Sequence, residues 1–437
     1  MYRNDSCRRR GPEIGLKYDE RMTTTSETAP GWSAAAQKVV DLEKDYLLQT
    51  YSRYPVVMHR GKGCYLYDVD GKRYLDLMAG IGVNALGHAH PRIVRVIREQ
   101  TNLLLHCSNL YYHEYQGPLA KKLAEISGLP RTFFCNSGTE AMEGALKMVR
   151  SHGGRISPEK LEIIALDNSF HGRTCGALSV TGQEKYRKDF EPLLAGVKFV
   201  PPNDEAALEQ AVGDRTAGIV IEWVQGEGGI YPLEVPYVRK AKELAERHNA
   251  LLVCDEIQCG VGRPGTYFAY QLADPVILPD VMVAAKPLAC GLPLGVIVAN
   301  EKAAAAIGPG MHGSTFGGGP LACRVALEFL DILESLLPHI HQVGGYFRME
   351  LAALAKHHSF IKEVRGYGLM IGVELDIPGK EIVLDALAEG MLINCTHDTV
   401  LRFLPPYIIQ DAEIDHAVKT LAKIFKKAKA GEGSPGV

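Results

Sequence analysis

The sequence predicts an α/β protein built on a mostly parallel sheet, and three observations support this prediction. Four short runs of residues are apolar throughout and rich in β-branched side chains, as strands buried on both faces of a parallel sheet are. Segments with helical periodicity separate these runs, which is the alternation of βα units. The 437 residues are 46% hydrophobic and 23% charged, so the chain has room for two or three domains with buried cores and is not typical of a disordered protein.

The N-terminal region begins without periodicity and continues as a helix and a hairpin. Residues 1–30 are expected to form a disordered extension, and Pro30-Gly31 marks its boundary. A helix is predicted over residues 34–48. Alternating apolar residues on both sides of Asp70-Gly71 predict a β-hairpin, because this dipeptide favours tight turns.

The central region carries the alternation of helices and strands. Helices are predicted over residues 119–127 and 140–149. The apolar runs that we expect to be strands are 162–166, 217–221, 250–254 and 281–285. Because the ligands of open parallel sheets bind at the C-terminal ends of the strands, polar residues that follow these runs are candidates for a site.

After Pro320 the pattern changes to that of a smaller α+β domain. Helices are predicted over 321–336, 382–388 and 411–427, with strand-like segments within 360–375 and at 400–404. The predicted organisation is an extension over 1–30, the N-terminal part of the small domain over 31–75, a large domain over 76–325 and the C-terminal small α+β domain over 326–437.

Charge, hydropathy and cysteine content narrow the classes of function. With 48 Lys and Arg against 51 Asp and Glu, the chain offers no basic surface for nucleic acid. The longest uncharged run, 303–323, is too rich in glycine and proline for a membrane helix, and no apolar stretch follows the basic N-terminus as in a secretory signal. The 10 cysteines show no C-x-x-C spacing, which indicates reduced thiols. We expect a cytoplasmic protein, or a mitochondrial one if its source is eukaryotic, with no nucleic-acid or membrane partner.

Two motifs resemble known binding patterns but lack the sequence context that a binding site requires. Gly260-Val-Gly-Arg-Pro-Gly265 matches the dinucleotide pattern G-x-G-x-x-G, but Pro264 and the aromatic residues after it do not open a helix. An NAD-dependent dehydrogenase is therefore a less favoured hypothesis for the function of this chain. His88 and His90 have no further ligand at suitable spacing, so no metal site is predicted.

Three other features each have an ordinary and a functional interpretation. Ser137-Gly138-Thr139 precedes a helix, and this segment is either a simple cap or an anion site. Asp255 ends an apolar run, either as a solvated loop acid or as the partner of a cationic ring nitrogen. Lys286 ends another run, either as a surface lysine or as a Schiff-base nucleophile. In combination they are the parts of a pyridoxal phosphate site, because the cofactor needs a phosphate cradle, an acid at its ring nitrogen and a lysine.

Residues 35–425 resemble the class III pyridoxal-phosphate-dependent aminotransferases of the acetylornithine/ornithine branch. The motifs that carry the resemblance are Gly80-Ile-Gly-Val-Asn-Ala-Leu-Gly-His, Asn136-Ser-Gly-Thr-Glu-Ala, Phe170-His-Gly-Arg-Thr, Glu222-Trp-Val-Gln-Gly-Glu-Gly-Gly, Asp255-Glu-Ile-Gln, Lys286 and His312-Gly-Ser-Thr-Phe-Gly-Gly. The resemblance implies fold type I of these enzymes, in which a large domain with a mostly parallel seven-stranded sheet between helices is joined to a smaller α+β domain. Trp223 and Gly319 depart from the commoner proline and asparagine of the family.

The resemblance also implies the roles of individual residues. Lys286 would be the Schiff-base residue and proton shuttle, and Asp255 would pair with the ring nitrogen. The other cofactor-binding residues would be Ser137, Gly138, Thr139, Phe170, His171, Gln258 and, from the neighbouring subunit, Thr315. The substrate-binding residues would be Arg173, Glu227, Ser314 and Arg402. A homodimer with shared active sites follows from the role of Thr315.

Arg402 and Glu227 form a hypothesis of their own within this resemblance. Arg402 would bind the α-carboxylate of glutamate or 2-oxoglutarate, and Arg173 the distal carboxylate, since a guanidinium offers a two-pronged fork. Glu227 would neutralise Arg402 when the amine donor brings no carboxylate to it, because an unpaired buried arginine is costly.

The identity of the amine donor is predicted from two motifs. The Gly80–His88 segment and Asn109-Leu-Tyr-Tyr resemble the acetylornithine branch, since the ornithine enzyme tends to carry a tyrosine near Ile81. We therefore expect transfer of the terminal amino group of N2-acetyl-L-ornithine to 2-oxoglutarate, giving N-acetyl-L-glutamate 5-semialdehyde and L-glutamate in arginine biosynthesis. Succinylornithine, a lysine-pathway analogue, ornithine and 4-aminobutyrate stay open as alternatives, as does a pyridoxal enzyme of another reaction type.

Overall fold

The computed structural model describes residues 33–431, which divide into two compact units of very different size. The smaller unit comprises residues 33–58 and 68–71, and the larger comprises 59–67 and 72–431. Helix α1 (Ala34–Tyr46) belongs to the smaller unit and begins at Ser33, whose hydroxyl accepts a hydrogen bond from the Ala36 amide at 3.2 Å. The predicted extension over 1–30 lies outside the described residues, and the predicted domain boundaries stay a prediction.

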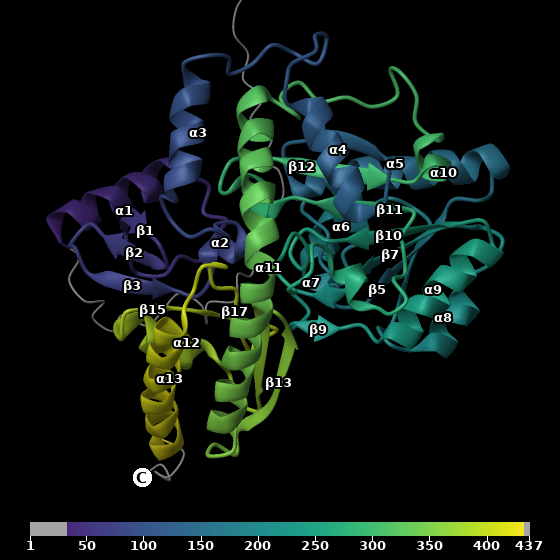
Figure 1. Ribbon diagram of the computed structural model, residues 1–437. Coiled ribbons are helices and arrows are strands. Elements are labelled where there is room, and N and C mark those ends of the chain that lie inside the picture. Colours follow the sequence, from purple (N-terminus) through teal and green to yellow (C-terminus); the bar gives the residue numbers. More distant parts are fainter. Residues whose placement is uncertain (1–32, 432–437) are drawn as a thin grey trace, which may run out of the picture. The chain divides into compact units, whose positions relative to one another are not determined.

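A seven-stranded sheet forms the centre of the larger unit (Figure 1). Its order is β4-β12-β11-β10-β7-β5-β6, and only β12 runs antiparallel to its neighbours. The strands are β4 (Arg131–Cys135), β5 (Glu162–Leu166), β6 (Val197–Val200), β7 (Thr216–Glu222), β10 (Leu251–Asp255), β11 (Val281–Ala284) and β12 (Gly295–Ala299). The predicted mostly parallel sheet of seven strands is confirmed, and the four apolar runs are β5, β7, β10 and β11.

Helices cover both faces of this sheet, which explains why its strands are apolar throughout. Successive residues of a strand point to opposite faces, so Val220 packs in one core cluster and its neighbours Ile219 and Ile221 in the other. Helix α5 (Gly138–Ile156) covers the first face, and α4 (Gln116–Ser127), α8 (Glu205–Ala211) and α9 (Val235–Arg247) cover the second. Shorter elements in this region are α6 (Cys175–Ser179), α7 (Glu184–Arg187), η2 (Lys188–Phe190), β8 (Val224–Gln225), β9 (Tyr231–Pro232), η3 (Ala269–Leu272), η4 (Lys286–Ala289) and α10 (Glu301–Ala304).

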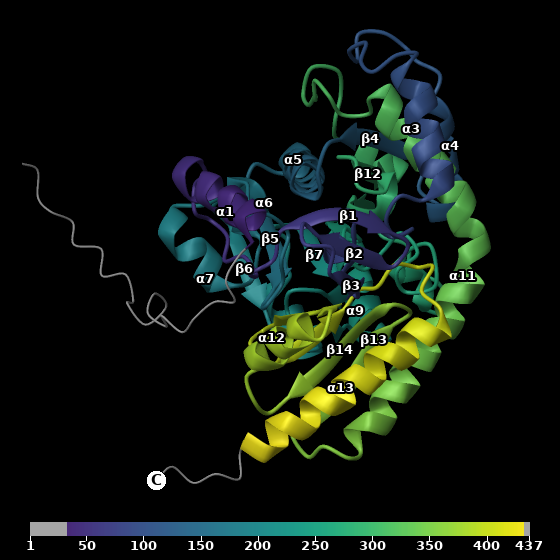
Figure 2. The same cartoon turned by 90° about the vertical axis from the view of Figure 1, so that its left-hand side faces the viewer.

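Helix α11 (Pro320–Ala355) links this region to a smaller antiparallel sheet (Figures 1 and 2). The sheet has the order β13-β14-β17-β16 and is accompanied by α12 and α13. The elements are β13 (Ile361–Tyr367), β14 (Met370–Leu375), α12 (Lys380–Ala388), β16 (Asn394–Thr396), β17 (Val400–Phe403) and α13 (Asp411–Gly431). The predicted end of the long helix at residue 336 is wrong. The helix continues past Pro338 because Val343, Phe347 and Leu351 keep its buried stripe packed on β13 and α13.

A second small sheet contains the predicted hairpin. Strands β2 and β3 are antiparallel, and β15 lies parallel to β3. The elements here are β1 (Met58–Lys62), β2 (Tyr65–Asp68), β3 (Arg73–Asp76), α2 (Ala79–Gly82), α3 (Pro91–Thr101) and β15 (Met391–Leu392). Within α2 the backbone is left-handed at Gly80 and Ile81, so this segment is a strained turn rather than a regular helix.

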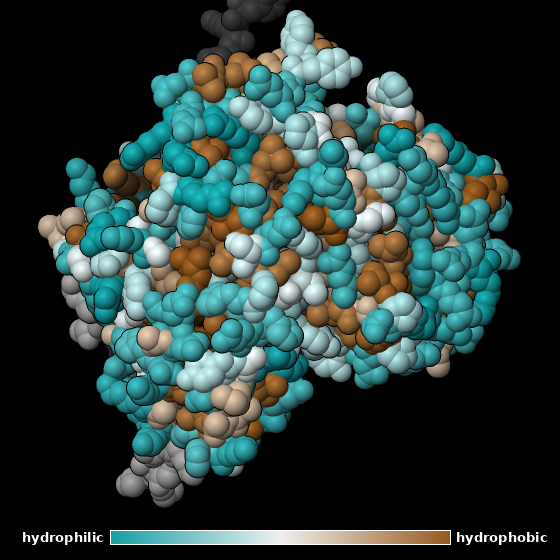
Figure 3. Space-filling view, in the orientation of Figure 1, coloured by the Kyte–Doolittle hydropathy of each residue, from teal (hydrophilic) through white to brown (hydrophobic). Residues whose placement is uncertain are grey.

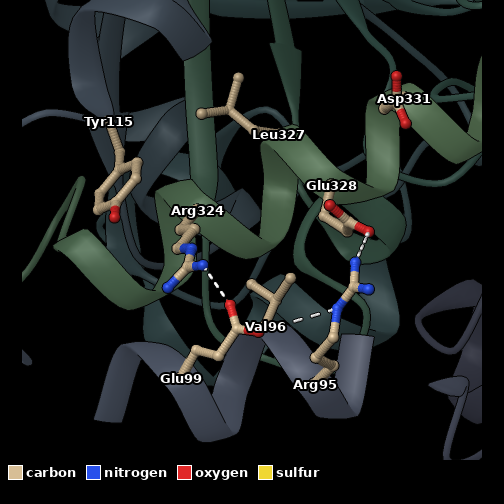
Figure 4. Close-up of a pocket in the computed structure, with 8 residues that line it drawn as sticks. All are labelled: Arg95, Val96, Glu99, Tyr115, Arg324, Leu327, Glu328 and Asp331. Carbon is tan, nitrogen blue, oxygen red and sulfur yellow. Dashed lines mark hydrogen bonds and ion pairs between the residues drawn. The ribbon is translucent and has the colours of Figure 1, made fainter. Parts of the chain in front are cut away.

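The surface between α3 and α11 holds a pocket in which charges of opposite sign alternate (Figure 4). Arg324 donates to Glu99 at 2.5 Å, and Arg95 lies 3.6 Å from Glu328. Since each of these arginines faces a carboxylate, neither is left unpaired for an anionic ligand. Hydrophilic side chains cover most of the face drawn in Figure 3, where hydrophobic ones gather in separate patches. Within residues 33–431, no helix has the length and apolarity that crossing a membrane requires.

Candidate active site

Two buried carboxylates lie side by side where β7 and β10 end. Asp255 pairs in register with Glu222 across the parallel strands, so the two side chains emerge on the same face of the sheet. Their residues are only 3% and 5% exposed. The interpretation of Asp255 as a solvated loop acid is therefore wrong.

His171 holds the Asp255 carboxylate in place. Its Nδ1 lies 2.7 Å from Asp255 Oδ2 in a fully enclosed environment. Burial lowers the pKa of His171, but the hydrogen bond and the negative charge of Asp255 outweigh it, so the pKa lies above its usual value. The other ring nitrogen, Nε2, is buried and has no hydrogen-bond partner within residues 33–431. His171 thus fixes one oxygen of the Asp255 carboxylate.

Lys286 follows β11 directly, at the start of the short helix η4. Burial lowers the pKa of its amine, and the negative charges of Glu227 and Asp255 only partly oppose this effect. In the described part of the chain, no hydrogen bond or ion pair involves its Nζ. A lysine amine that is desolvated and unpaired has a larger neutral fraction and is a better nucleophile.

The start of α5 presents free backbone amides to the same edge of the sheet. Ser137 is the N-cap, and its hydroxyl accepts from the Glu140 amide at 3.2 Å. The amides of Gly138 and Thr139 then occupy the first helical positions, which have no partner inside a helix. A side chain at Gly138 would collide with Ile257, so only glycine lets the backbone approach here. The structure therefore shows the cap, and the two amides beside it are those that an anion would bind.

Ser314 and Thr315 lie on the loop that precedes α11. Ser314 reaches the start of α5, where its hydroxyl accepts from Asn136 Nδ2 at 3.2 Å. Thr315 is exposed, and among the residues described it makes no hydrogen bond with another predicted site residue. The structure therefore brings Ser314 to the site of its own chain and leaves Thr315 facing outward.

An ion pair joins the turn after β8 to the smaller antiparallel sheet. Arg402 on β17 is 1% exposed and donates to the Glu227 carboxylate. It also donates to Gln258 at 3.2 Å and to Asn394 at 3.1 Å. Burial raises the pKa of Glu227, but the charge and hydrogen bond of Arg402 outweigh it and hold the pKa below its usual value. Arg402 is therefore a buried cation, and within residues 33–431 its ion pair is with Glu227.

Arg173 is the exposed cation of the region. Its guanidinium lies 4.0 Å from the ring centre of Tyr186 and 5.4 Å from that of Phe170. Within the described chain it makes no ion pair with a carboxylate. This arrangement leaves its donor groups available to an anionic ligand.

Sequence reasoning missed two buried glutamates. Glu222 accepts hydrogen bonds from the amides of Phe170 and Gly226, and Glu256 accepts from those of Ala269 and Tyr270. The signal for Glu222 was its place at the end of an apolar run, the same signal that identified Asp255. The motif residues His88 and Arg263 are used inside the fold, because His88 lies 2.8 Å from Asp76 and Arg263 donates to the Leu369 and Pro405 carbonyls.

Comparison with known proteins places this geometry in a family. A model of the aminotransferase class-III family matches residues 46–425. The acetylornithine aminotransferase of Methanocaldococcus jannaschii is 48% identical over 393 residues, or 89% of this chain and 98% of the relative. The acetylornithine aminotransferase of Aquifex aeolicus is 47% identical over 381 residues, or 87% of this chain and 100% of the relative. The ornithine aminotransferase structure from Toxoplasma gondii ME49 has a TM-score of 0.86 and 32% identity, covering 91% of this chain and 96% of that one.

The matched region contains every residue of the candidate site, from Ser137 to Arg402. It also contains the whole seven-stranded sheet on which fold type I of the pyridoxal phosphate enzymes is built. The chain therefore belongs to the class-III aminotransferases and is a pyridoxal-phosphate-dependent enzyme.

Proposed function

We propose that the chain moves the terminal amino group of N2-acetyl-L-ornithine to 2-oxoglutarate, giving N-acetyl-L-glutamate 5-semialdehyde and L-glutamate, a step of arginine biosynthesis. The observation that carries this proposal is the ion pair between Arg402 and Glu227 beside Lys286. A site that alternates between a substrate with a carboxylate on the amine-bearing carbon and a substrate without one there needs a buried cation with a removable partner. The names of the two curated relatives support the donor.

The residues present fit pyridoxal phosphate. The amides of Gly138 and Thr139 and the Ser137 hydroxyl would hold its phosphate. Asp255, fixed by His171, would face the protonated ring nitrogen, and Phe170 would cover the ring. When bound, the cofactor supplies an electron sink for the bonds at the amine-bearing carbon.

The charged residues would then have distinct tasks. Lys286 would bind the cofactor through its amine and carry the proton between the two carbons of the reacting system. Arg402 would bind the α-carboxylate of glutamate or 2-oxoglutarate after Glu227 moves away. Arg173 would bind the distal carboxylate, and Gln258 and Ser314 would complete the polar walls of the site.

Ornithine is the second candidate donor, because the enzyme from Toxoplasma gondii with a similar structure is an ornithine aminotransferase. The residue that argues against it is Ile81, which is 42% exposed on the left-handed turn of α2. An aliphatic side chain there gives an α-ammonium group no hydrogen-bond acceptor, whereas an N-acyl group needs none.

Exposed apolar residues support the proposal of a homodimer with shared sites. The 103–112 segment and the loop before α11 expose large hydrophobic side chains that a stable monomer would be expected to bury: Leu103, Leu105, Leu110, Tyr111, Tyr112 and Phe316. Phe316 is next to Thr315, so a subunit that covered this surface would also meet Thr315. In this proposal Thr315 binds the cofactor phosphate of the partner subunit, and the enzyme acts in the cytoplasm.

The test is the visible absorption spectrum of the protein with pyridoxal phosphate, recorded before and after N-acetylornithine is added without 2-oxoglutarate. We expect the band of the lysine-bound cofactor to disappear as its amino form accumulates. A band that ignores N-acetylornithine but responds to ornithine would make ornithine the donor. If no band formed after pyridoxal phosphate was added, the assignment of Lys286 would be wrong.

A further inference from the structure

Glu222 connects two parts of the site that are otherwise separate. Its Oε1 accepts the Phe170 amide at 2.8 Å, and its Oε2 accepts the Gly226 amide at 3.1 Å. The residue is 5% exposed, so water cannot replace either contact freely. Both oxygens of one carboxylate are therefore committed to the backbone of two different loops.

The first of these loops carries the face that covers the cofactor ring. Phe170 is followed by His171, whose side chain is bound to Asp255. Because Asp255 lies next to Glu222 in the sheet register, the Phe170-His171 dipeptide is held by two neighbouring strand ends. Glu222 fixes its backbone and Asp255 fixes its imidazole.

The second loop carries the partner of Arg402. Gly226 immediately precedes Glu227, and a side chain at Gly226 would collide with the carboxamide of Gln258. Gln258 in turn accepts a hydrogen bond from Arg402 at 3.2 Å. The contact between Glu222 and Gly226 is thus the anchor at the base of the Glu227 side chain.

We propose that Glu222 is a positioning residue that sets Phe170 against the cofactor ring and Glu227 against Arg402 through the two oxygens of one carboxylate. This inference rests on the roles proposed above for Phe170 and Glu227. It makes the cover of the ring and the neutralisation of Arg402 depend on the same buried group, which touches neither substrate nor cofactor.

The protonation state of Glu222 matters for this role, because only the ionised carboxylate offers two full acceptors. Burial raises the pKa of Glu222 to about 7, against the opposing positive charge of His171. The other charged groups that act on it are Asp255 and, from η4, Lys286. Below pH 7 one of the two anchors is therefore expected to weaken.

Glu222→Gln tests the proposal, since an amide keeps one acceptor and turns the other into a donor. Two quantities are measured: the dissociation constant of pyridoxal phosphate from the apo-protein, and the half-saturation constant for glutamate in single turnovers. We expect the first to rise about tenfold as Phe170 loosens, and the second to fall about threefold because Glu227 competes less well for Arg402. The pH dependence of cofactor affinity near 7 should also become flatter than in the wild type.

Glu256→Gln is the matched control. Glu256 is 0% exposed, accepts two backbone amides at 2.8 and 3.0 Å, and has its pKa raised by burial to about 7, but it holds η3 instead of the site. This variant should lose stability and leave both constants within about twofold of the wild type. Glu222→Asp, whose shorter carboxylate can reach only one loop, should alter one constant more than the other and serves if Glu222→Gln does not fold.

Two results would overturn the proposal. One is a Glu222→Gln protein whose constants both match the wild type. The other is a Glu222→Gln protein whose affinities for cofactor and for glutamate fall by the same factor, as a general loss of structure would cause. Glutamate is the only substrate used, so the outcome does not depend on which amine donor the enzyme takes. Conversely, failure of N-acetylornithine as donor would leave this test intact.

Discussion

At the scale of single residues, burial shifts the pKa values of the basic and acidic groups in the candidate site in opposite directions. It lowers the pKa of Lys286 and raises that of Glu222, while neighbouring charges hold the pKa of Glu227 below its usual value. A lysine whose pKa is lowered therefore lies close to a glutamate whose pKa is also held below its usual value. This is the distribution of charge that a nucleophilic lysine and a removable counter-ion require.

The pair of Glu227 and Arg402 leads to the first prediction. Glu227→Gln removes the negative charge and keeps the shape of the side chain, so Arg402 stays without a counter-ion whenever the amine donor is bound. We expect the rate of the donor half-reaction to fall by tenfold or more, about 1.4 kcal/mol or more in activation free energy, while the glutamate half-reaction keeps its rate. Single-turnover kinetics of the two half-reactions measure this difference.

The control for this prediction is Glu389→Gln, which removes the carboxylate that Lys423 of α13 binds at the end of α12, on elements that carry no residue of the candidate site. It should leave the balance between the half-reactions unchanged. Equal losses of both half-reactions in the Glu227 variant would contradict the assigned role.

Lys286 and Asp255 could be predicted from the sequence because each ends a run of apolar residues, and the position of a strand end is a local signal. The residues that contact the site residues could not be predicted from the sequence in this way. Glu222 binds the Phe170 amide and Gln258 binds Arg402 only because strands and loops distant in sequence meet in the fold. A hydrogen bond between two loops leaves no periodic trace in the chain.

At the scale of elements, Glu256 stabilises the short helix η3 and gives a pH-dependent prediction. Burial raises its pKa from 4.5 to about 7, so the folded protein holds this proton more firmly than the unfolded chain does. The protonated Glu256 side chain contributes fully to stability below pH 4.5, and this contribution is lost as the pH rises through 7. We expect the free energy of unfolding to fall by up to about 3 kcal/mol over this window on account of Glu256.

Urea unfolding at pH 5.5, 6.5 and 7.5 measures this effect in the wild type and in Glu256→Gln. The variant cannot release a proton at this position, so its stability should change less steeply with pH. Other titrating groups affect both proteins alike, and identical slopes would show that Glu256 does not contribute.

Helix α11 gives a second prediction at this scale. Pro338 lies inside the helix, where it lacks the amide that would bond to the preceding turn. Pro338→Ala should restore this bond and raise the free energy of unfolding by about 1 to 3 kcal/mol, measured by urea denaturation. Pro320→Ala, at the first turn of the same helix, is the control and should give no gain, because proline is well suited to that position.

The same helix shows where prediction of elements fails. An internal proline is a local stop signal, so the sequence predicts an end at residue 336. The packing of Val343, Phe347 and Leu351 on distant strands overrides it. The edge strand β4 and the antiparallel β12 were missed for a related reason, since their pairing with each other is decided by the sheet and not by their own composition.

At the scale of the whole molecule, the order of the strands explains why residues from five regions of the chain meet. Strands β5, β7, β10 and β11 are parallel, so their C-terminal ends lie at one edge, where Glu222, Asp255 and Lys286 follow them. The start of α5 adds the amides of Gly138 and Thr139. Arg402 arrives from the smaller sheet through its ion pair with Glu227. The seven-stranded sheet could be predicted from its apolar strands. The contact between Arg402 on the smaller sheet and Glu227 in the turn after β8 could not be predicted from them.

The last prediction concerns the assembly of two chains. If Thr315 serves the partner's site and Lys286 serves its own, each site draws these two residues from different subunits. Lys286→Ala and Thr315→Ala dimers should each have low activity at limiting pyridoxal phosphate. A hybrid of the two variants has one site in which Lys286 and Thr315 are both present, and one in which both are missing. Unfolding and refolding an equimolar mixture should make about half of the dimers hybrids, so about a quarter of the wild-type activity should return.

Two controls test whether the recovered activity comes from hybrid dimers. Mixing without unfolding should restore activity only as fast as subunits exchange, and refolding each variant alone should restore none. Phe316→Asp, placed in the exposed apolar surface, should shift the sedimentation of the protein toward the monomer and prevent complementation in the mixture. Because complementation depends on two residues acting in one site from two chains, a mixture that stays as inactive as its components would show that Thr315 acts within its own subunit or not at all.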